Sequence, residues 1–397
     1  MIVFFILEII VFSFFLATAV YNILFSVAAF FYVPYANRNK IARSESADGQ
    51  KFAILIPAYK EDAVILKTVT KNLESFPDSE IVYDIIVIAD SLKRETIEAL
   101  KNMQVLVHEV KFEKSTKVKS LKSALNEYQN YTHVIILDAD NVMDGSFLPL
   151  VSKAINNYNL GAIQGRRSAK NGGTSVSILD GLSEEISNRV YRQGLAVFNI
   201  GVPLAGSGMV FEYELIKRLI NETDAVGGFD KALQVKLFES GVKTRYMKDA
   251  IVFDEKTDTV EVFENQRKRW LYSHFHFLKM YFRQGIKGLL NNNFDLFNMA
   301  VLLHGQLPRL YNLALMFIVT AIYFLFGRYL VLSAWLWLAV TSVYVFSLFL
   351  AIPRKYFNKS IIIAIVKLPR LFLTMFLLLF KLKGSNKSFI HTPHKHA

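Results

Sequence analysis

An apolar run at the amino terminus constrains the fold of this chain more than any other feature of its sequence. Residues 2–33 are almost continuously apolar, and Glu8 is the only charged residue among them. Since about twenty such residues cross the hydrocarbon core of a bilayer, we expect a transmembrane helix within residues 1–35. No Lys or Arg precedes the run and no cleavage-site pattern ends it, so we do not expect a removable signal peptide.

A basic cluster follows this run instead of preceding it. Arg38, Lys40 and Arg43 stand in a polar segment, residues 36–50, which has the composition of a linker. Because Lys and Arg favour the cytoplasmic side of a membrane, we expect the amino terminus outside and the following residues in the cytoplasm. The sequence thus predicts an integral, multi-pass protein of a bacterial inner membrane, with its main polar domain in the cytoplasm.

Apolar segments return after about residue 296. Two runs, 310–326 and 329–352, are separated only by a Gly-Arg pair, which predicts a transmembrane helical hairpin over 309–352. Residues 273–308 begin with a mixture of aromatic and basic side chains, a composition typical of helices that lie in the membrane interface.

The last apolar segment, residues 353–383, is ambiguous. Lys367, Pro369 and Arg370 stand within it, and a cation at the centre of a bilayer costs about 2.5–3.5 kcal/mol on insertion scales. We therefore favour an interfacial or re-entrant helix, with a third C-terminal membrane helix as the alternative. Residues 384–397 are basic and are expected to form a cytoplasmic tail.

The charge balance bears on the partners of the chain. Its net charge of +12 fits either nucleic acid or anionic lipid headgroups. Because many Lys and Arg residues flank the apolar runs, we assign the charge to the membrane surface and expect no nucleic-acid partner. The chain has no cysteine, which excludes disulfides, thiolate metal sites and cysteine nucleophiles.

Between the membrane segments, residues 51–272 have the sequence pattern of a folded polar domain. Short β-branched apolar runs at 52–57, 84–90 and 133–140 are separated by helix-like stretches. Buried parallel strands that alternate with helices indicate an α/β domain with a mostly parallel, Rossmann-like sheet. Such sheets bind ligands at the carboxyl ends of their strands. At these ends the chain carries Glu61, Asp90, Asp138 and Asp140.

Asp138 and Asp140 give the strongest signal in this domain. Two carboxylates one residue apart after a strand can share a divalent cation that also holds a diphosphate, and oxygen ligands suit Mg²⁺ or Mn²⁺. In isolation, the same pattern also fits a solvated turn. The surrounding motifs favour the metal.

These motifs together resemble the membrane-bound family 2 glycosyltransferases, the group that contains cellulose, chitin and hyaluronan synthases. The resemblance covers residues 50–275, and it implies a GT-A-like cytoplasmic domain flanked by transmembrane and interfacial helices. The most specific match is QRKRW at 266–270, which fits the QxxRW motif. The other matches are IPAYKED at 56–62, Asp90 after DIIVIA, TKVKSLK at 116–122, DAD at 138–140 and GSGMVF at 206–211.

The resemblance implies a site for a nucleotide sugar, with a UDP-sugar as the expected donor. Gln266 and Arg269 share one helix face, and Arg269 can bind diphosphate oxygens in a bidentate manner. Trp270 offers an apolar wall for a sugar ring. The implied donor-binding residues are Pro57, Ala58, Tyr59, Glu61, Asp90, Lys117, Lys119, Asp138, Gln266 and Arg269; Asp138 and Asp140 would hold the metal, and Ser207, Gly208 and Trp270 would bind the acceptor.

One lysine of the TKVKSLK segment is expected to approach the diphosphate. We favour Lys117 over Lys119, since Lys117 occupies the family's Gly-Lys position. Thr116 stands where the family usually has glycine.

The resemblance also implies an aspartate that removes the proton of the acceptor hydroxyl. Asp230 takes this position, followed by a helix and Gly241, although the preceding Thr-Glu of the family is absent. The alternative role of Asp230 is to cap the helix. Glu255 is the next candidate for the base.

The sequence therefore predicts an inverting hexosyltransferase that moves sugar from a UDP-sugar to a growing β-linked polysaccharide, with coupling to export as a further expectation. Transfer to a lipid-linked acceptor is the nearest alternative. A transporter or receptor with a nucleotide-binding module is a more distant one, for which His304 and Arg309 would be the candidate intramembrane residues. The expected partners are the donor, the glycan acceptor and membrane lipids, while a homo-oligomer or an export partner stays open.

Overall fold

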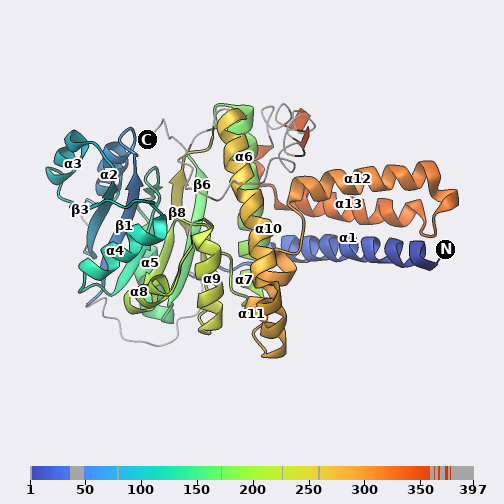
Figure 1. The fold of residues 1–397 in the computed structure, drawn as a ribbon, viewed down its shortest axis with the longest axis horizontal. Helices are drawn as coiled ribbons and strands as arrows, with labels where there is room; N and C mark the ends of the chain where they lie inside the picture. The colour runs from blue at the N-terminus through green and yellow to red at the C-terminus, as the bar shows by residue number, and fades with distance from the viewer. Residues whose placement is uncertain are drawn as a thin grey trace.

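The chain forms a sheet domain joined through a central layer of helices to a bundle of three long helices (Figure 1). The computed structural model describes residues 2–35, 49–77, 80–170, 172–225, 227–257 and 260–357, with isolated residues between 362 and 376. The expected linker 36–50 and the segment 353–383 lie mostly outside the described residues, and the tail 384–397 lies wholly outside them.

One eight-stranded sheet forms the centre of the polar domain, with the strand order β3-β2-β1-β4-β7-β6-β8-β5. The pairings β1–β2, β1–β4, β2–β3 and β6–β8 are parallel, whereas β4–β7, β6–β7 and β5–β8 are antiparallel. The predicted α/β class is confirmed, and the sheet is mixed. The strands are β1 Lys51–Tyr59, β2 Val82–Asp90, β3 Leu106–Val110, β4 His133–Ile136, β5 Val142–Met143, β6 Ala162–Ala169, β7 Met209–Glu212 and β8 Arg245–Asp254.

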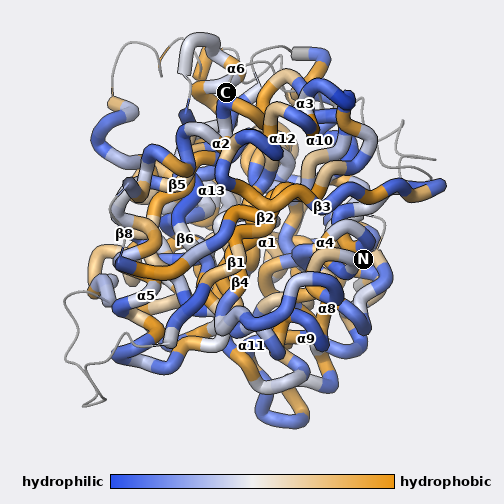
Figure 2. Tube along the Cα trace, turned by 90° about the vertical axis from the view of Figure 1, so that its left-hand side faces the viewer, coloured by the Kyte–Doolittle hydropathy of each residue, from blue (hydrophilic) through white to orange (hydrophobic). Residues whose placement is uncertain are grey.

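Both faces of the sheet are buried because successive side chains of each strand point to opposite sides. In β1, Phe52, Ile54 and Ile56 belong to the core beneath α2 and α5. Ala53 and Leu55 belong to the core beneath α4 and α8. Figure 2 shows the hydrophobic strands β1 and β4 at the centre of the domain. The covering helices are α2 Ile65–Glu74, α3 Arg94–Lys101, α4 Lys117–Glu127, α5 Phe147–Tyr158, α8 Tyr213–Asn221 and α9 Phe229–Glu239.

Two long helical segments form the central layer between the sheet and the bundle (Figure 1). The expected boundary between residues 272 and 273 falls inside one of them, α10, which runs unbroken over Val260–Leu290. Gly194, in the other segment, lets α1 approach closely, because a Cβ there would lie 2.2 Å from the carbonyl oxygen of Phe25. The remaining elements of this layer are α6 Ser175–Ser187, the π-helical η3 Asn188–Gly194, α7 Leu195–Val197, α11 Phe294–Phe297 and the π-helical η4 Asn298–Leu303.

Three described helices are long and apolar enough to cross a membrane. They are α1 Ile2–Ala28, α12 Arg309–Phe326 and α13 Ala334–Ala351, with the 3₁₀ turns η1 Ala29–Phe31, η5 Gly327–Tyr329 and η6 Arg354–Tyr356 nearby. They lie side by side and extend away from the sheet (Figure 1). Their outer side chains are exposed, with Leu325 at 74% and Trp335 at 69%, as expected for surfaces that face lipid.

Polar contacts join the three helices at their far end and within the bundle. The carboxylate of Glu8 accepts hydrogen bonds from the backbone N–H groups of Val331 and Leu332, the latter at 2.6 Å. The hydroxyl groups of Thr320 and Thr341 lie 2.9 Å apart between α12 and α13. The only charge of the first apolar run therefore serves the turn of the hairpin.

Candidate functional site

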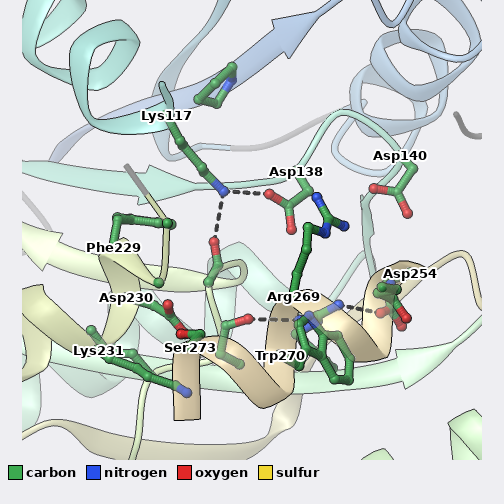
Figure 3. A pocket seen from close by; sticks show the side chains of 18 of the residues that line it. Lys117, Asp138, Asp140, Phe229, Asp230, Lys231, Asp254, Arg269, Trp270 and Ser273 are labelled. Carbon is green, nitrogen blue, oxygen red and sulfur yellow. Dashed lines mark hydrogen bonds and ion pairs between the residues drawn. The ribbon is translucent and has the colours of Figure 1, made fainter. Parts of the chain in front are cut away.

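A cavity of about 650 Å³ opens at the carboxyl ends of β1, β2 and β4. The amino-terminal part of α9 and the first half of α10 form its opposite wall (Figure 3). Three predicted residues, Lys119, Ser207 and Gly208, do not line it. The predicted residues that do are Pro57, Ala58, Tyr59, Glu61, Asp90, Lys117, Asp138, Asp140, Asp230, Gln266, Arg269 and Trp270.

Asp90 ends β2 at one side of the cavity, and its side chain is only 1% exposed. One carboxylate oxygen, Oδ1, accepts a hydrogen bond of 3.1 Å from the hydroxyl group of Ser91. The other, Oδ2, is buried and has no hydrogen-bond partner among the described residues. Because leaving a buried acceptor unsatisfied is costly, this oxygen indicates a place for a hydrogen-bond donor of a ligand.

Lys117 is the first residue of α4, and the helix start directs its side chain into the cavity. The Thr116 hydroxyl group caps the helix by accepting a hydrogen bond of 3.2 Å from the Lys119 N–H group. The Lys117 ammonium group pairs with the Asp138 carboxylate and donates to the Gly206 carbonyl oxygen at 2.8 Å. Lys119 donates instead to the Lys114 carbonyl oxygen, outside the cavity.

Ser207 supports the Asp138 backbone, and both Ser207 and Gly208 lie outside the lining of the cavity. The Asp138 N–H group donates to the buried Ser207 hydroxyl oxygen at 2.9 Å. Gly208 has a φ of +64°, and a Cβ there would lie 3.1 Å from a methyl group of Val252. The cavity wall beside them consists of Leu204, Ala205 and Gly206.

The carboxylates of Asp138 and Asp140 both line the cavity. The Glu255 N–H group donates to Asp140 Oδ2 at 3.0 Å, which holds this carboxylate in place. The described part of the chain contains no group of three or more His, Asp or Glu residues that could hold a metal alone. Two carboxylates still fit Mg²⁺ or Mn²⁺, because such ions are commonly held by one or two carboxylates together with substrate phosphates and water.

The QRKRW segment lies on α10 and faces the cavity from the side opposite Lys117. Gln266, Arg269 and Trp270 all line the cavity. Figure 3 shows the Arg269 side chain pointing from α10 toward Asp138. Trp270 keeps 42% of its surface exposed, so its ring is available to a ligand.

Arg267, between the motif residues, anchors α10 to α6. Its guanidinium group forms a buried ion pair with Asp180. It also lies 4.5 Å from the centroid of the Trp270 ring, within the range of a cation–π contact. The sequence motif alone did not identify this residue, since it stands at one of the variable positions of QxxRW.

Asp230 is the second residue of α9, and the helix does not use its side chain as a cap. The N-cap residue is Gly228, with a φ of +66° and no side-chain cap. A Cβ at Gly228 would lie 2.5 Å from the Ser273 hydroxyl oxygen, so glycine lets α9 approach α10 closely. Asp230 is half-buried in the cavity wall. Burial lowers the pKa of the adjacent Lys231, and the charge of Asp230 raises it.

The cavity floor carries a network of buried charges that the sequence analysis did not predict. Arg167 pairs with Asp254, and the Lys256 ammonium group lies 2.8 Å from Asp254 Oδ2. Glu184 pairs with Arg192 at 3.0 Å. Burial raises the pKa of Glu184, but Lys256, Arg192 and Arg167 lower it to about 2.

Only part of this network has a signal in the sequence. Arg167 lies near the end of β6 and Asp254 ends β8, so both follow the same strand-end rule that identified Asp90. Glu184 and Arg192 lie within helical segments, where a charged residue usually indicates a solvated face.

A family model described as glycosyltransferase-like family 2 matches residues 49–273, more than half of the 397 residues. The chain belongs to this family. Residues 49–273 therefore form a family 2 glycosyltransferase-like domain, and its α/β fold is GT-A-like.

Two further similarities were found, one in sequence and one in fold. A probable glycosyltransferase from Bacillus subtilis, YdaM, is 24% identical over 260 residues, which are 62% of this chain and 61% of that protein. This chain thus spans less than two thirds of the length of that relative. The mannosyltransferase PcManGT from Pyrobaculum calidifontis, solved with GDP-Man and Mn²⁺, has a TM-score of 0.54 and 15% identity. That match covers 94% of this chain and 98% of the solved one, and it shows a shared fold.

Proposed function

We propose that this family member is an inverting glycosyltransferase that uses a UDP-sugar and one divalent cation. The observation that carries the proposal is the content of a single cavity. Five residues that line it carry the expected roles. Asp90 would bind the nucleobase, Asp138 and Asp140 are the candidate metal ligands, Arg269 is the cation on α10, and Asp230 is the half-buried aspartate.

The buried Oδ2 atom of Asp90 supports uracil as the base. Because Oδ1 already accepts a hydrogen bond from Ser91, Oδ2 is the acceptor that remains for a donor group of the nucleobase. Uracil presents one N–H group on its pairing edge, whereas guanine presents two neighbouring donors. PcManGT was solved with GDP-Man, so competition between UDP and GDP is the direct test of this assignment.

The diphosphate would lie between the strand ends and α10. Lys117 and Arg269 approach this region from opposite walls (Figure 3). Their charges would offset the negative charge that builds on the departing nucleoside diphosphate. A divalent cation held by Asp138 and Asp140 would supply further electrophilic stabilisation of the leaving group.

Asp230 is proposed as the general base on the acceptor side. Its carboxylate accepts the proton of the acceptor hydroxyl group while the acceptor oxygen forms a bond to the anomeric carbon. The bond from that carbon to the diphosphate oxygen breaks at the same time, and the diphosphate leaves with the bonding electrons. A single displacement inverts the anomeric centre, so an α-linked donor gives a β-linked product.

Two classes of acceptor are compatible with this chemistry. Resemblance to the processive synthases supports a growing β-linked polysaccharide that is passed on toward the membrane helices. A lipid-linked acceptor is the second candidate, and an apolar cavity beside the first one favours it. Sizing of the products separates the two, since a processive enzyme gives long chains and a lipid-directed enzyme adds a defined number of sugars.

We also propose that the glycosyltransferase domain is cytoplasmic in a multi-pass membrane protein. The basic cluster after the first apolar run supports this orientation. The three candidate spans extend to the same side of the domain (Figure 1). Labelling of a cysteine introduced at Ser46 in intact cells tests the proposal, because the chain has no native thiol. Ready labelling by an impermeant reagent would reverse the orientation.

The activity itself is tested with a panel of radiolabelled nucleotide sugars and the purified full-length protein. We expect transfer from one or a few UDP-sugars, with Mg²⁺ or Mn²⁺ present, onto acceptors extracted from membranes. Transfer that depends only on GDP-sugars would refute the uracil assignment. Binding without any transfer across the panel and acceptors would refute the proposed activity.

A further inference from the structure

A second cavity, of about 430 Å³, lies between the catalytic domain and the membrane helices. Lys231, Arg267 and His274 line both cavities, so the second adjoins the first on its acceptor side. Asp230 lines the first cavity, and its chain neighbour Lys231 lines both. A molecule in the second cavity therefore lies against the first turn of α9, which carries the proposed base.

Most of the wall of this second cavity is apolar and comes from elements near the membrane. Leu179 and Leu182 lie on α6, Leu303 on η4, Leu313 on α12 and Leu348 on α13. Residues of both helices of the predicted hairpin thus reach the cavity. An apolar chain that occupies it would be continuous with the bilayer that surrounds these helices.

The charges in this cavity have a single sign. No Asp or Glu belongs to its described lining, which contains Lys231, Arg309, Arg192 and Arg267. Arg192 and Arg267 are paired with carboxylates beyond the wall, whereas Lys231 and Arg309 form no salt bridge within the described chain. Burial, and then the nearby Lys231, lowers the pKa of His274 to about 4, so this ring is neutral at neutral pH.

Arg309 is the most specific of these groups. Its Nη2 atom donates to the Ser183 carbonyl oxygen at 2.7 Å and to the Ser187 hydroxyl oxygen at 2.9 Å. Its Nη1 atom is buried and has no hydrogen-bond partner among the residues described. A guanidinium group fixed through Nη2, whose Nη1 has no described acceptor, suits a phosphate oxygen.

We propose that the second cavity binds the phosphate group and the first part of the apolar chain of a lipid-linked glycan acceptor. The inference rests on the proposed glycosyltransferase function and narrows its acceptor to an anionic lipid. Arg309 and Lys231 bind the phosphate, the leucine wall surrounds the chain, and the sugar of the acceptor extends to Asp230. An anion beside Lys231 also offsets the cost of burying that ammonium group.

Charge complementarity and the apolar wall favour a lipid phosphate over two other ligands, a neutral glycan and a free phosphate ion. A neutral glycan would offer no counter-charge to Arg309 and Lys231 and would not fill the leucine wall. A free phosphate ion would use the cations but leave the apolar volume empty. A lipid phosphate uses both parts of the cavity.

The test measures binding to the purified full-length protein in non-ionic detergent by native mass spectrometry. Farnesyl phosphate is the probe, farnesol is the neutral comparator and inorganic phosphate is the competitor. We expect farnesyl phosphate to bind at least about tenfold more tightly than farnesol, as a charge-assisted hydrogen bond would give. We expect equimolar inorganic phosphate not to displace it. Equal affinity for phosphate and alcohol, or displacement by inorganic phosphate, would overturn the proposal.

Two variants locate the site, and a third is the control. Arg309→Gln should weaken farnesyl phosphate at least about tenfold and leave farnesol unchanged. Leu179→Trp, at a half-buried cavity residue outside the core clusters, should weaken both ligands. Lys236→Gln is the control, because Lys236 lies on the same helix as Lys231 and outside both cavities. Wild-type binding by both Arg309→Gln and Leu179→Trp would overturn the assignment.

UDP-sugar binding is measured on the same preparations. If the protein binds farnesyl phosphate as expected but transfers no sugar, the proposed function is refuted and the lipid site is still supported. If the protein transfers sugar but binds farnesyl phosphate and farnesol equally well, the lipid site is refuted and the glycosyltransferase function is still supported.

Discussion

Replacing Asp90 with leucine should abolish most of the affinity for UDP while leaving the fold intact. The Asp90 carboxylate is buried, and its Oδ2 atom has no hydrogen-bond partner among the described residues. Leucine has the same branched arrangement of side-chain heavy atoms and removes an acceptor that no described residue satisfies. The only described partner lost is the hydroxyl group of Ser91, which is exposed to water.

The magnitude follows from the bond that the ligand would lose. A hydrogen bond to a charged group contributes about 1.5–3 kcal/mol, so the Kd for UDP should rise about 10- to 150-fold. Asp90→Asn keeps a neutral acceptor and should have a smaller effect, since charge-assisted bonds are roughly twice as strong as neutral ones. The thermal stability of Asp90→Leu without nucleotide should equal or exceed that of the wild type, because a buried unpaired carboxylate is costly.

Isothermal titration with UDP and Mg²⁺, together with thermal melts without nucleotide, measures both quantities. Asp84→Asn, on the same strand but at the surface beside Lys51, is the matched control and should bind UDP normally. Unchanged UDP affinity in Asp90→Leu would refute a nucleotide role for Asp90. Weaker binding together with a lower melting temperature would indicate a structural role instead.

Three further predictions follow from the site. Asp140→Ala or excess chelator should stop transfer, and full turnover in either case would exclude the proposed metal. Asp180→Ala should lower the free energy of unfolding by about 3–5 kcal/mol, because it leaves Arg267 as a buried unpaired charge. The double variant Asp180→Ala/Arg267→Met should regain most of this stability, as measured by denaturant unfolding. Burial, then Lys231, lowers the pKa of His274 from 6.5 to about 4, so the neutral ring stabilises the fold above about pH 6.5. Between pH 6.5 and 4 the unfolded chain binds this proton and the folded chain does not, so the wild type should lose about 2 kcal/mol of stability between pH 7.5 and 5 and more as the pH falls toward 4. His274→Gln should show a weaker acid dependence in melts at pH 7.5 and 5.

Much of the sheet was predictable because its strands are buried on both faces. The runs that contain Ile54, Ile86 and Ile135 are β-branched and apolar, and they become β1, β2 and β4. The strand-end rule then gave Asp90 and Asp138 without knowledge of the fold. Strand β6 has the mixed sequence AIQGRRSA, which carries no clear strand periodicity, and the pairing that places it beside β8 is long-range.

The parts that sequence could not give depend on the direction of side chains and on distant partners. Lys117 and Lys119 are two residues apart on α4, so the helix turns them to different sides, and only the three-dimensional structure shows which one enters the cavity. Ser207 was expected to bind the acceptor, but its hydroxyl group is buried beneath Asp138. The second cavity, around Arg309, combines residues of α6, η3, α9, α10, η4, α12 and α13, and no local sequence pattern reveals such a combination.

The measurement that tests the central claim most directly compares donor binding and sugar transfer in Asp230→Asn. Asparagine keeps the size of the side chain and loses the ability to accept a proton. We expect near-normal affinity for the nucleotide donor and a transfer rate lower by about 10²–10⁴-fold. Asp224→Asn, an exposed residue outside the cavity, serves as the control and should transfer sugar at the wild-type rate. Transfer by Asp230→Asn at a near-native rate would contradict the assignment and move the search for the base to Glu255, which also lines the cavity.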